Sequence, residues 1–320
     1  LDNLRRRGSE LNVPRLRSGG VEFIHGDVRN PADLDFTRPD WIIECSAEPS
    51  ALAGRNGGMD YLVHTNLLGT YHCLELARNH RAQMVFLSTS RVYPISRLQQ
   101  LPFDEQETRF SLESRFQQGV SQNGIAEDFP LEGARTLYGA TKLASEMLIA
   151  EYVDTFDLDI VINRCGVLTG PWQMGKIDQG IVVLWLARHF FGGNLSYIGF
   201  GGSGKQVRDL LHVADLADLV ILQLSNIEQH SGQTYNVGGG LKNSVSLQEL
   251  TKTCQELTGN EIQVRSDLED RPGDIPWFVT NSNKIVTKTG WNPQRPLKAI
   301  LQEILIWLED HQQTLRNILS

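Results

Sequence analysis

The chain contains the apolar run Trp41-Ile42-Ile43-Glu44-Cys45 and, further along, the run Met84-Val85-Phe86-Leu87-Ser88. Between them, apolar residues recur every three or four positions across 62–76, which predicts a helix. Further runs of the same kinds follow: strand-like at 21–25 and 160–162, and helical at 143–152. Strands that are apolar on both faces and alternate with helices indicate crossover connections and a parallel sheet. We therefore predict an α/β fold, a doubly wound parallel sheet of the Rossmann kind.

The sequence after about residue 165 has a different rhythm, with shorter elements and clustered glycines at 192–193, 199, 201–202, 204 and 238–240. This part predicts a smaller α+β lobe. We expect the main domain to comprise 1–165 plus about 206–236, and the lobe to comprise about 166–205 plus 237–320. An amphipathic pattern from about 297 to 308 predicts a last helix.

The segment from Ser96 to Arg135 lacks clear periodicity and is rich in Gln, Ser, Glu and Arg. A connection of this length is usually functional or mobile. Two interpretations stay open: a loop that covers the substrate, or a solvated insertion.

Composition excludes several classes of protein. The net charge of −8 argues against a nucleic-acid-binding or anionic-membrane surface. No apolar run reaches the ~18 residues that a membrane span needs. The four cysteines are scattered and never form a CxxC pair, so they indicate small core residues, with no metal site. We expect a cytoplasmic protein.

The motif Tyr138-Gly139-Ala140-Thr141-Lys142 opens a predicted helix, and its i, i+4 spacing places Tyr138 and Lys142 on one face. Removing a hydride from a secondary alcohol requires a base for the hydroxyl proton. A tyrosine, with an ordinary pKa near ~10, becomes such a base when a neighbouring ammonium stabilises the phenolate. Lys142 would also hold the ribose of the cofactor.

Hydroxyl residues finish the run that ends with Ser88 and Thr89, about 50 positions before Tyr138. Ligands of an open α/β sheet lie at the carboxyl ends of its strands. A Ser or Thr hydroxyl there would both donate to and accept from the substrate oxygen.

Three further signals indicate a dinucleotide. Asp27-Val28 ends one predicted strand, where a carboxylate accepts from an adenine amino group. Ser46-Ala47 ends another, where small residues allow close approach. Asp2 suits a ribose diol and would repel a 2′-phosphate, which favours NAD over NADP. NADP stays an alternative cofactor because of the nearby cations Arg5, Arg6 and Arg7.

Taken together, these residues resemble the extended short-chain dehydrogenase/reductases, the NAD-dependent sugar epimerase/dehydratase family. The resemblance covers essentially the whole chain and includes Asn66-Leu67-Leu68-Gly69-Thr70, YGATK at 138–142, Arg164 with Gly170-Pro171, and Gly204-Lys205-Gln206-Val207-Arg208-Asp209. Within the family, Asp178-Gln179-Gly180 and 204–209 most resemble members that epimerise CDP-paratose and CDP-tyvelose at C2.

The resemblance implies NAD in the main domain, a nucleotide sugar in the lobe, and a homodimer or larger homo-oligomer through helices near 60–78 and 139–153. It implies catalytic roles for Thr89, Tyr138 and Lys142. It implies NAD-binding roles for Asp2, Asp27, Val28, Ser46, Ala47, Asn66, Ser88, Tyr138 and Lys142. It places Thr89, Gln179, Arg208 and Arg271 near the sugar and diphosphate.

Two positions in the sequence limit the type of reaction that we expect. Dehydratases of the family carry an Asp-Glu pair after the strand threonine, where this chain has Ser90 and Arg91. Neither side chain supplies the carboxylic acid and carboxylate that an elimination needs. We therefore expect oxidation to a ketone, turning of the ketone and hydride return. The alternatives are another nucleotide-sugar epimerase or reductase, for example at C4, and a non-catalytic dinucleotide-binding regulator.

The family opens with a strand and a glycine-rich turn whose helix N-terminus binds the diphosphate. No such turn precedes Asp2. We expect one βα unit of roughly 30 residues to be missing from the front. Glu44 stands where the family more often has a histidine.

Overall fold

The computed structural model describes residues 1–320 except 36–37, 56, 114–116, 177–178 and 320. The chain divides into two compact units. The first comprises 1–92, 136–164 and 220–234, and the second 93–135, 165–219 and 235–320.

The first unit carries most of a four-stranded sheet in the order β1-β2-β7-β11. Its elements are η1 (Ser9–Leu11), α1 (Asn12–Ser18), η2 (Pro31–Leu34), β1 (Trp41–Glu44), α2 (Met59–Val63), η3 (His64–Leu68), α3 (Gly69–His80), β2 (Gln83–Thr89), η4 (Ser90–Val92), α5 (Leu137–Phe156), β7 (Ile160–Cys165), α7 (Val213–Leu224), η6 (Ile227–Gln229) and β11 (Thr234–Val237). Boundaries between the two units fall within β7, α7 and β11.

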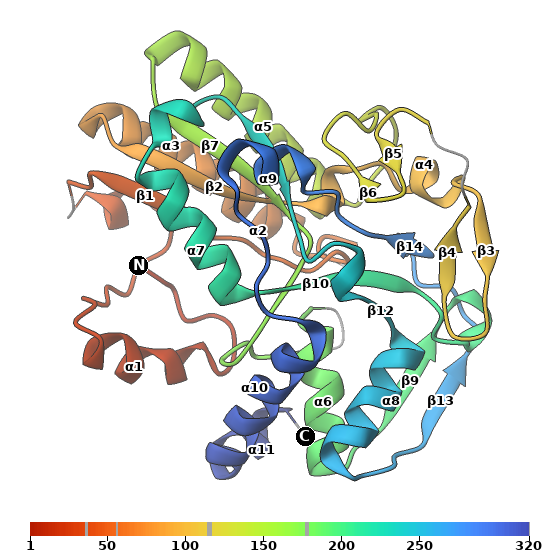
Figure 1. The fold of residues 1–320 in the computed structure, drawn as a ribbon. Coiled ribbons are helices and arrows are strands. Elements are labelled where there is room, and N and C mark those ends of the chain that lie inside the picture. The colour runs from red at the N-terminus through yellow and green to blue at the C-terminus, as the bar shows by residue number, and fades with distance from the viewer. Residues whose placement is uncertain (36–37, 56, 114–116, 177–178, 320) are drawn as a thin grey trace. The chain divides into compact units, whose positions relative to one another are not determined.

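A parallel pair, β1 and β2, aligns Trp41 with Gln83 and Glu44 with Phe86. The helix α3 packs against β1, α5 packs against β2, and the two helices contact each other (Figure 1). A buried apolar cluster that includes Leu74, Phe86 and Ile149 fills the space between sheet and helices. The α/β class and these strands and helices are confirmed.

The strand predicted at 21–25 is much reduced. Only one parallel bridge, between Asp2 and His25, is present there. The backbone N–H of Asp2 donates to Ile24 O, and Gly26 N donates to Asp2 O. The segment around Asp2 and the segment 24–26 therefore still lie side by side.

The second unit contains a mixed sheet in which β10 pairs with β8, β12 and β14. Its elements are α4 (Ile95–Gln99), β3 (Phe103–Glu105), β4 (Phe110–Leu112), β5 (Val120–Ser121), β6 (Gly124–Ile125), β8 (Val167–Thr169), α6 (Ile181–Phe191), β9 (Leu195–Ile198), η5 (Phe200–Gly202), β10 (Val207–His212), η7 (Leu241–Asn243), β12 (Ser244–Ser246), α8 (Leu247–Thr258), β13 (Val264–Asp267), β14 (Trp277–Phe278), α9 (Asn283–Thr289), α10 (Leu297–Asp310) and α11 (Gln312–Leu319).

The predicted last helix is confirmed as α10. Its inward face is apolar, with Ile300, Leu301 and Ile304 fully buried. The helix contacts α6 and α8, which lie beside it in Figure 1. A conventional hydrophobic core thus stabilises this part of the second unit.

The described residues of 96–135 form most of α4 and two short antiparallel hairpins, β3–β4 and β5–β6. Arg109, in the turn of β3–β4, donates through Nε to Glu249 Oε1 (2.7 Å) and pairs its Nη2 with Glu249 Oε2. Glu249 also completes the capping box that starts α8, with Ser246. One carboxylate therefore both caps the helix and anchors the hairpin.

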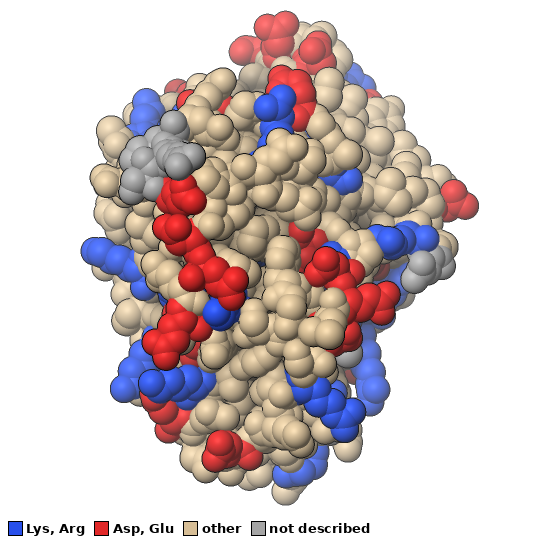
Figure 2. All heavy atoms as spheres, turned by 90° about the vertical axis from the view of Figure 1, so that its right-hand side faces the viewer, with Lys and Arg blue, Asp and Glu red and all other residues tan. Residues whose placement is uncertain are grey.

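The two compact units divide the chain differently from the predicted domains, because 93–135 and 206–219 fall in the second unit. The predicted assignment of cofactor to one domain and substrate to the other stays a prediction. Figure 2 shows acidic and basic side chains interspersed on the face that it presents. Among the described residues, no helix combines the length and the apolar character required to cross a membrane.

Candidate active site

The helix α5 positions Tyr138 and Lys142. Thr136 caps it: its Oγ1 accepts from Gly139 N (3.1 Å), which fixes the start of the helix at Leu137, one residue before Tyr138. Tyr138 is 9% exposed and Lys142 is 1% exposed. Both side chains are therefore on the inward face, as the i, i+4 spacing predicts.

The first half of the buried face of α5 is polar, whereas Ile149 further along belongs to the apolar cluster. Besides Lys142, the first half carries Thr141, Ser145 and Glu146, all buried. The Lys142 ammonium lies 3.8 Å from the centroid of the Phe86 ring. Burying an ammonium is costly, so an inward lysine at this position is explained better by chemistry than by packing.

Thr89 and Ser88 end β2, as predicted, and both are buried. The Thr89 hydroxyl accepts from Arg91 N (3.2 Å). The Ser88 hydroxyl donates to Glu146 Oε1 (2.5 Å), so it is engaged inside the protein. Its predicted NAD-binding role stays a prediction.

Glu146 and Arg164 form a buried ion pair, with 2.7 Å between Arg164 Nη2 and Glu146 Oε2. The pair joins α5 to β7, and through Ser88 also to β2. Sequence reasoning did not identify Glu146. Its only signal was a carboxylate placed four residues after Lys142 on the same helical face.

Asn66 lies in the π-helical turn η3 and is fully buried. Its side-chain amide both accepts from Glu48 N (2.7 Å) and donates to Thr141 Oγ1 (3.2 Å). Its carbonyl oxygen accepts from Ser145 Oγ (3.0 Å). Asn66 therefore fixes the segment after β1 against α5, which is a positioning role.

The predicted ribose ligand Asp2 is exposed, and its Oδ1 accepts from Leu4 N (2.7 Å). The guanidinium of Arg5, which left NADP open, lies 3.6 Å from the centroid of the Tyr61 ring. Arg29 lies over the same ring at 4.6 Å. Tyr61 thus engages two of the cations nearest to Asp2 and Asp27 in sequence.

Asp27 is extensively paired. Arg29 Nη2 donates to Asp27 Oδ2 (2.8 Å), and Asn3 Nδ2 donates to the same oxygen (2.9 Å). Arg29 holds the pKa of Asp27 far below its usual range. An adenine amino group would have to displace one of these bonds. Val28 packs against Gly69, the first residue of α3. A Cβ at position 69 would lie 2.7 Å from Val28 Cγ2, so only glycine at this position allows the helix to lie so close to the turn at Val28.

Ser46 and Ala47 follow β1 and are half-buried. The Ser46 hydroxyl donates to Glu44 Oε1 (2.6 Å), and Thr70 Oγ1 donates to Glu44 Oε2 (3.1 Å). The unusual Glu44 is thus a buried carboxylate held by two hydroxyls.

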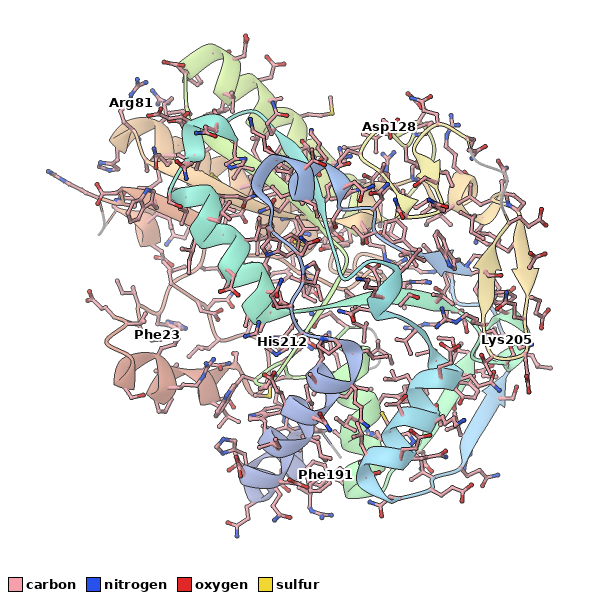
Figure 3. All side chains as sticks on the ribbon, viewed as in Figure 1. Phe23, Arg81, Asp128, Phe191, Lys205 and His212 are labelled. Atoms are coloured by element: carbon pink, nitrogen blue, oxygen red, sulfur yellow. The ribbon has the colours of Figure 1, made fainter. Side chains whose placement is uncertain are left out.

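Three of the predicted substrate ligands, Gln179, Arg208 and Arg271, lie in the second unit, and the fourth, Thr89, lies in the first. Arg208, on β10, donates through Nη2 to Asp274 Oδ1 and to Ile275 O, both at 2.8 Å. Asp274 N donates to the backbone carbonyl of Arg271 (3.1 Å), so the backbone of Arg271 lies in a turn with the residue that pairs with Arg208. Figure 3 labels His212, which ends β10, and Lys205, which precedes the first residue of β10 by two positions.

Gln179 is half-buried and pairs with Lys176 in an isolated bridge. Asp178, quoted in the same motif, lies outside the described residues. No group of three or more His, Cys, Asp or Glu suited to a metal ion occurs in the described parts of the chain. The predicted absence of a metal stays a prediction.

Asp209 was missed as an individual residue. It is 1% exposed, and its oxygens accept from Gly240 N (3.0 Å) and from both Thr280 N and Oγ1 (3.1 Å each). Burial raises its pKa. Asp209 therefore ties β10, which carries Arg208, to the glycine turn at 238–240.

Comparisons with known proteins identify the family of the chain. Residues 1–238 match the model of the NAD dependent epimerase/dehydratase family. The chain is 30% identical over 316 residues to CDP-paratose 2-epimerase of Salmonella typhi, covering 96% of this chain and 90% of that protein. It is 27% identical over 282 residues to dTDP-glucose 4,6-dehydratase of Haemophilus influenzae, covering 84% and 76%. A dTDP-glucose 4,6-dehydratase structure from Streptomyces venezuelae with NAD bound has a TM-score of 0.75 and 25% identity, covering 95% and 84%.

The chain belongs to the NAD dependent epimerase/dehydratase family. It is an enzyme, and its cofactor is NAD. The first unit fits this group: a buried ammonium at Lys142, buried hydroxyls at Thr89 and Tyr138, and an exposed carboxylate at Asp2 suit a dinucleotide.

Proposed function

We propose that this enzyme epimerises a nucleotide sugar at C2, with CDP-paratose and CDP-tyvelose as the interconverted pair. The observation that carries the proposal is a redox trio, Thr89, Tyr138 and Lys142, without the acid pair that an elimination needs. The 30% identity to CDP-paratose 2-epimerase supports the choice of sugar.

The side chains of the first unit handle the proton. Bound NAD⁺ supplies the hydride acceptor. Tyr138, as phenolate, takes the proton of the sugar hydroxyl, and the ammonium of Lys142 stabilises that phenolate through its positive charge. The Thr89 hydroxyl hydrogen-bonds to the reacting oxygen. Tyr138 then returns the proton after the ketone has presented its other face.

The residues after Thr89 support a redox cycle over a dehydration. Ser90 and Arg91 form the start of η4, where dehydratases have carboxyl groups. A guanidinium cannot act as a general acid or base near neutral pH, since its pKa lies above 12. With no acid to protonate a leaving hydroxyl, the ketone survives until the hydride returns.

In the second unit, Arg208 and Arg271 would hold the diphosphate and Gln179 would lie near the sugar. Arg208 is half-buried, and its Nη2 is already oriented by Asp274 and Ile275. The bonds to Asp274 and Ile275 use Nη2, so Arg208 would contact a phosphate through its positive charge and its remaining N–H groups.

The test uses CDP-paratose or CDP-tyvelose deuterated at C2, with NMR of the product. We expect inversion at C2, with the label kept at C2 and no consumption of external NADH. Tyr138→Phe is the matched inactive control. Recovery of a 4-keto-6-deoxy sugar from a 6-hydroxylated substrate, or no inversion with either CDP sugar, would contradict the proposal.

We also propose that the enzyme is a homodimer or larger homo-oligomer that works in the cytoplasm. Apolar side chains are exposed on η3, α3 and α5: Leu68, Tyr71, Leu137, Met147 (66%) and Phe156. Exposed apolar groups on neighbouring helices are typical of an interface. All four cysteines are free thiols, which suits a reducing compartment.

A further inference from the structure

Glu44 places a carboxylate inside the first unit, at the edge of the sheet where ligands bind. It is the last residue of β1 and is 3% exposed. Ligands of an open α/β sheet lie at the carboxyl ends of its strands. In the described part of the chain, both partners of the carboxylate are hydroxyls, those of Ser46 and Thr70, and no ion pair neutralises it. A buried charge of this kind is costly, so its presence calls for an explanation.

The side chain of Glu44 faces the helices that cover the sheet. Along β1, Trp41 and Ile43 are exposed, whereas Ile42 packs against the buried apolar cluster. Because successive side chains of a strand alternate between its two faces, Glu44 lies on the same buried side as Ile42. The helix α3 packs against β1 there (Figure 1), and Thr70 Oγ1 on that helix lies 3.1 Å from Glu44 Oε2. A carboxylate therefore occupies a position where packing alone would favour an apolar residue.

The ammonium of Lys142 lies near this carboxylate, with the ring of Phe86 as a common neighbour. Glu44 is the register partner of Phe86 on the parallel strand β2. Such partners are about 4.8 Å apart and have their side chains on the same face. Lys142 Nζ lies 3.8 Å from the centroid of the Phe86 ring. Burial raises the pKa of the Cys73 thiol, the charge of Glu44 raises it further, and the charge of Lys142 lowers it. Glu44 and Lys142 are therefore opposite charges in one buried region.

The chemistry of the site brings a third charge into this region. Tyr138, as base, takes the proton of the alcohol whose hydride passes to the nicotinamide ring, so that ring must lie close to Tyr138. Lys142 is one helical turn away on the same face of α5. The nicotinamide of NAD⁺ carries a positive charge that NADH lacks, and the ammonium of Lys142 repels it. The anion of Glu44 offsets this repulsion for the oxidised cofactor and gives little to the reduced one.

We propose that Glu44 gives the enzyme its preference for NAD⁺ over NADH, by placing a fixed negative charge near the nicotinamide end of the cofactor. The carboxylate acts through its charge and not as a donor or acceptor of the reacting proton. This preference suits a reaction in which each turnover starts from NAD⁺ and regenerates it. The inference rests on the proposed function through the roles of Tyr138 and Lys142, and goes beyond it by assigning the redox preference to one residue.

Calorimetric titration of the nucleotide-free protein with NAD⁺ and, separately, with NADH tests the inference. Glu44→Gln keeps the size of the side chain and removes the charge, so the ratio of the Kd for NADH to the Kd for NAD⁺ should fall by about tenfold or more. A merely structural role would weaken both forms of the cofactor alike and leave this ratio unchanged. Glu44→Asp keeps the charge, and its ratio should stay within about threefold of the unaltered protein. Lys142→Met removes the repelling ammonium, so the ratio should rise.

The matched control is Glu75→Gln. Glu75 is a carboxylate on α3, but Arg78 Nη2 pairs with its Oε2 at 2.8 Å, so the loss of its charge should leave the ratio unchanged. Glu44→His introduces the residue that the family more often has at this position. It removes the same negative charge, so the ratio should fall as in Glu44→Gln, and it decides the matter even if Glu44→Gln does not fold.

An unchanged ratio in both Glu44→Gln and Glu44→His would overturn the inference and leave the proposed function standing. An equal fall in Glu44→Asp or in Glu75→Gln would overturn it as well, because the negative charge at position 44 would then not be the cause. A ratio that does not rise in Lys142→Met would instead contradict the role of Lys142, and with it both the proposed function and the inference.

Discussion

The helices α5 and α10 bury opposite kinds of side chain. The inward face of α10 consists of Ile300, Leu301, Ile304, Trp307 and Leu308. The inward face of α5 includes Lys142, Ser145 and Glu146, while Met147 and Leu137 are exposed. Apolar burial stabilises α10 directly, whereas α5 must pair every polar group that it buries. The buried polar residues in the first half of α5 are therefore explained by chemistry and not by packing.

The largest expected effect concerns the buried pair on α5. Arg164→Met leaves the Glu146 carboxylate buried beside Ser88 without its cation, so we expect a loss of about 3–5 kcal/mol in the free energy of unfolding. Denaturant titration measures it. Ile304→Val on α10 should cost only about 0.5–1.5 kcal/mol. A smaller loss for Arg164→Met than for Ile304→Val would reverse the comparison.

Tyr138→Phe removes the proposed base but keeps the ring. We expect turnover to fall by about 100-fold or more, with the unfolding midpoint nearly unchanged. Steady-state kinetics and a thermal scan check the two parts. Near-normal turnover would show that the polar face of α5 serves stability alone.

Arg208→Ala removes a proposed diphosphate ligand. Because such a contact is similar in the ground and transition states, KM should rise by about tenfold or more with little change in kcat. Arg97→Ala, at an exposed pair with Glu132, is the control and should change neither. An unchanged KM for Arg208→Ala would remove this arginine from the site.

The apolar region around α6 contains one buried histidine. Burial lowers the pKa of His189, whose Nδ1 contacts Trp185 O (2.8 Å). Below about pH 6.5 the unfolded chain takes up a proton that the folded chain does not, so stability should fall as the pH decreases below that value. Thermal scans across this range should show a weaker dependence in His189→Leu.

His80→Gln, at an exposed position, should retain the full pH dependence. The dependence will not vanish in His189→Leu, because burial also lowers the pKa of His212. An identical slope in His189→Leu and the unaltered protein would contradict the assignment.

The smallest expected effect on stability is that of Met147→Lys. At 66% exposure, the change should alter the unfolding free energy by no more than about 0.5 kcal/mol in a monomer. It should nevertheless weaken the proposed dimer, which light scattering after size exclusion measures. The same oligomeric state in Met147→Lys and in the unaltered protein would show that the exposed face around Met147 is not the interface.

Periodicity predicted β2, β7 and α10 because each buries apolar residues in the rhythm of its backbone. The strand β1 was predicted from its apolar run, although Trp41 and Ile43 are exposed in the structure. Periodicity also favoured a helix over 143–152. It did not identify the inward polar residues of α5, and Tyr138 and Lys142 were predicted from the motif at 138–142 instead. Glu146 and Asp209 were missed as individual residues, since a sequence does not reveal burial of a polar group. Residues 96–135 showed no rhythm because their strands of two or three residues are too short to display one.

The shared carboxylate of Glu249 has a consequence for the order of folding. Its bonds with Arg109 span 140 residues of chain, so the β3–β4 hairpin can dock only after a very long loop has closed. The first turn of α8 needs only the nearby Ser246. Docking of the hairpin is thus a late event, and amide exchange in β3 and β4 should be governed by local opening well before the rest of the unit unfolds.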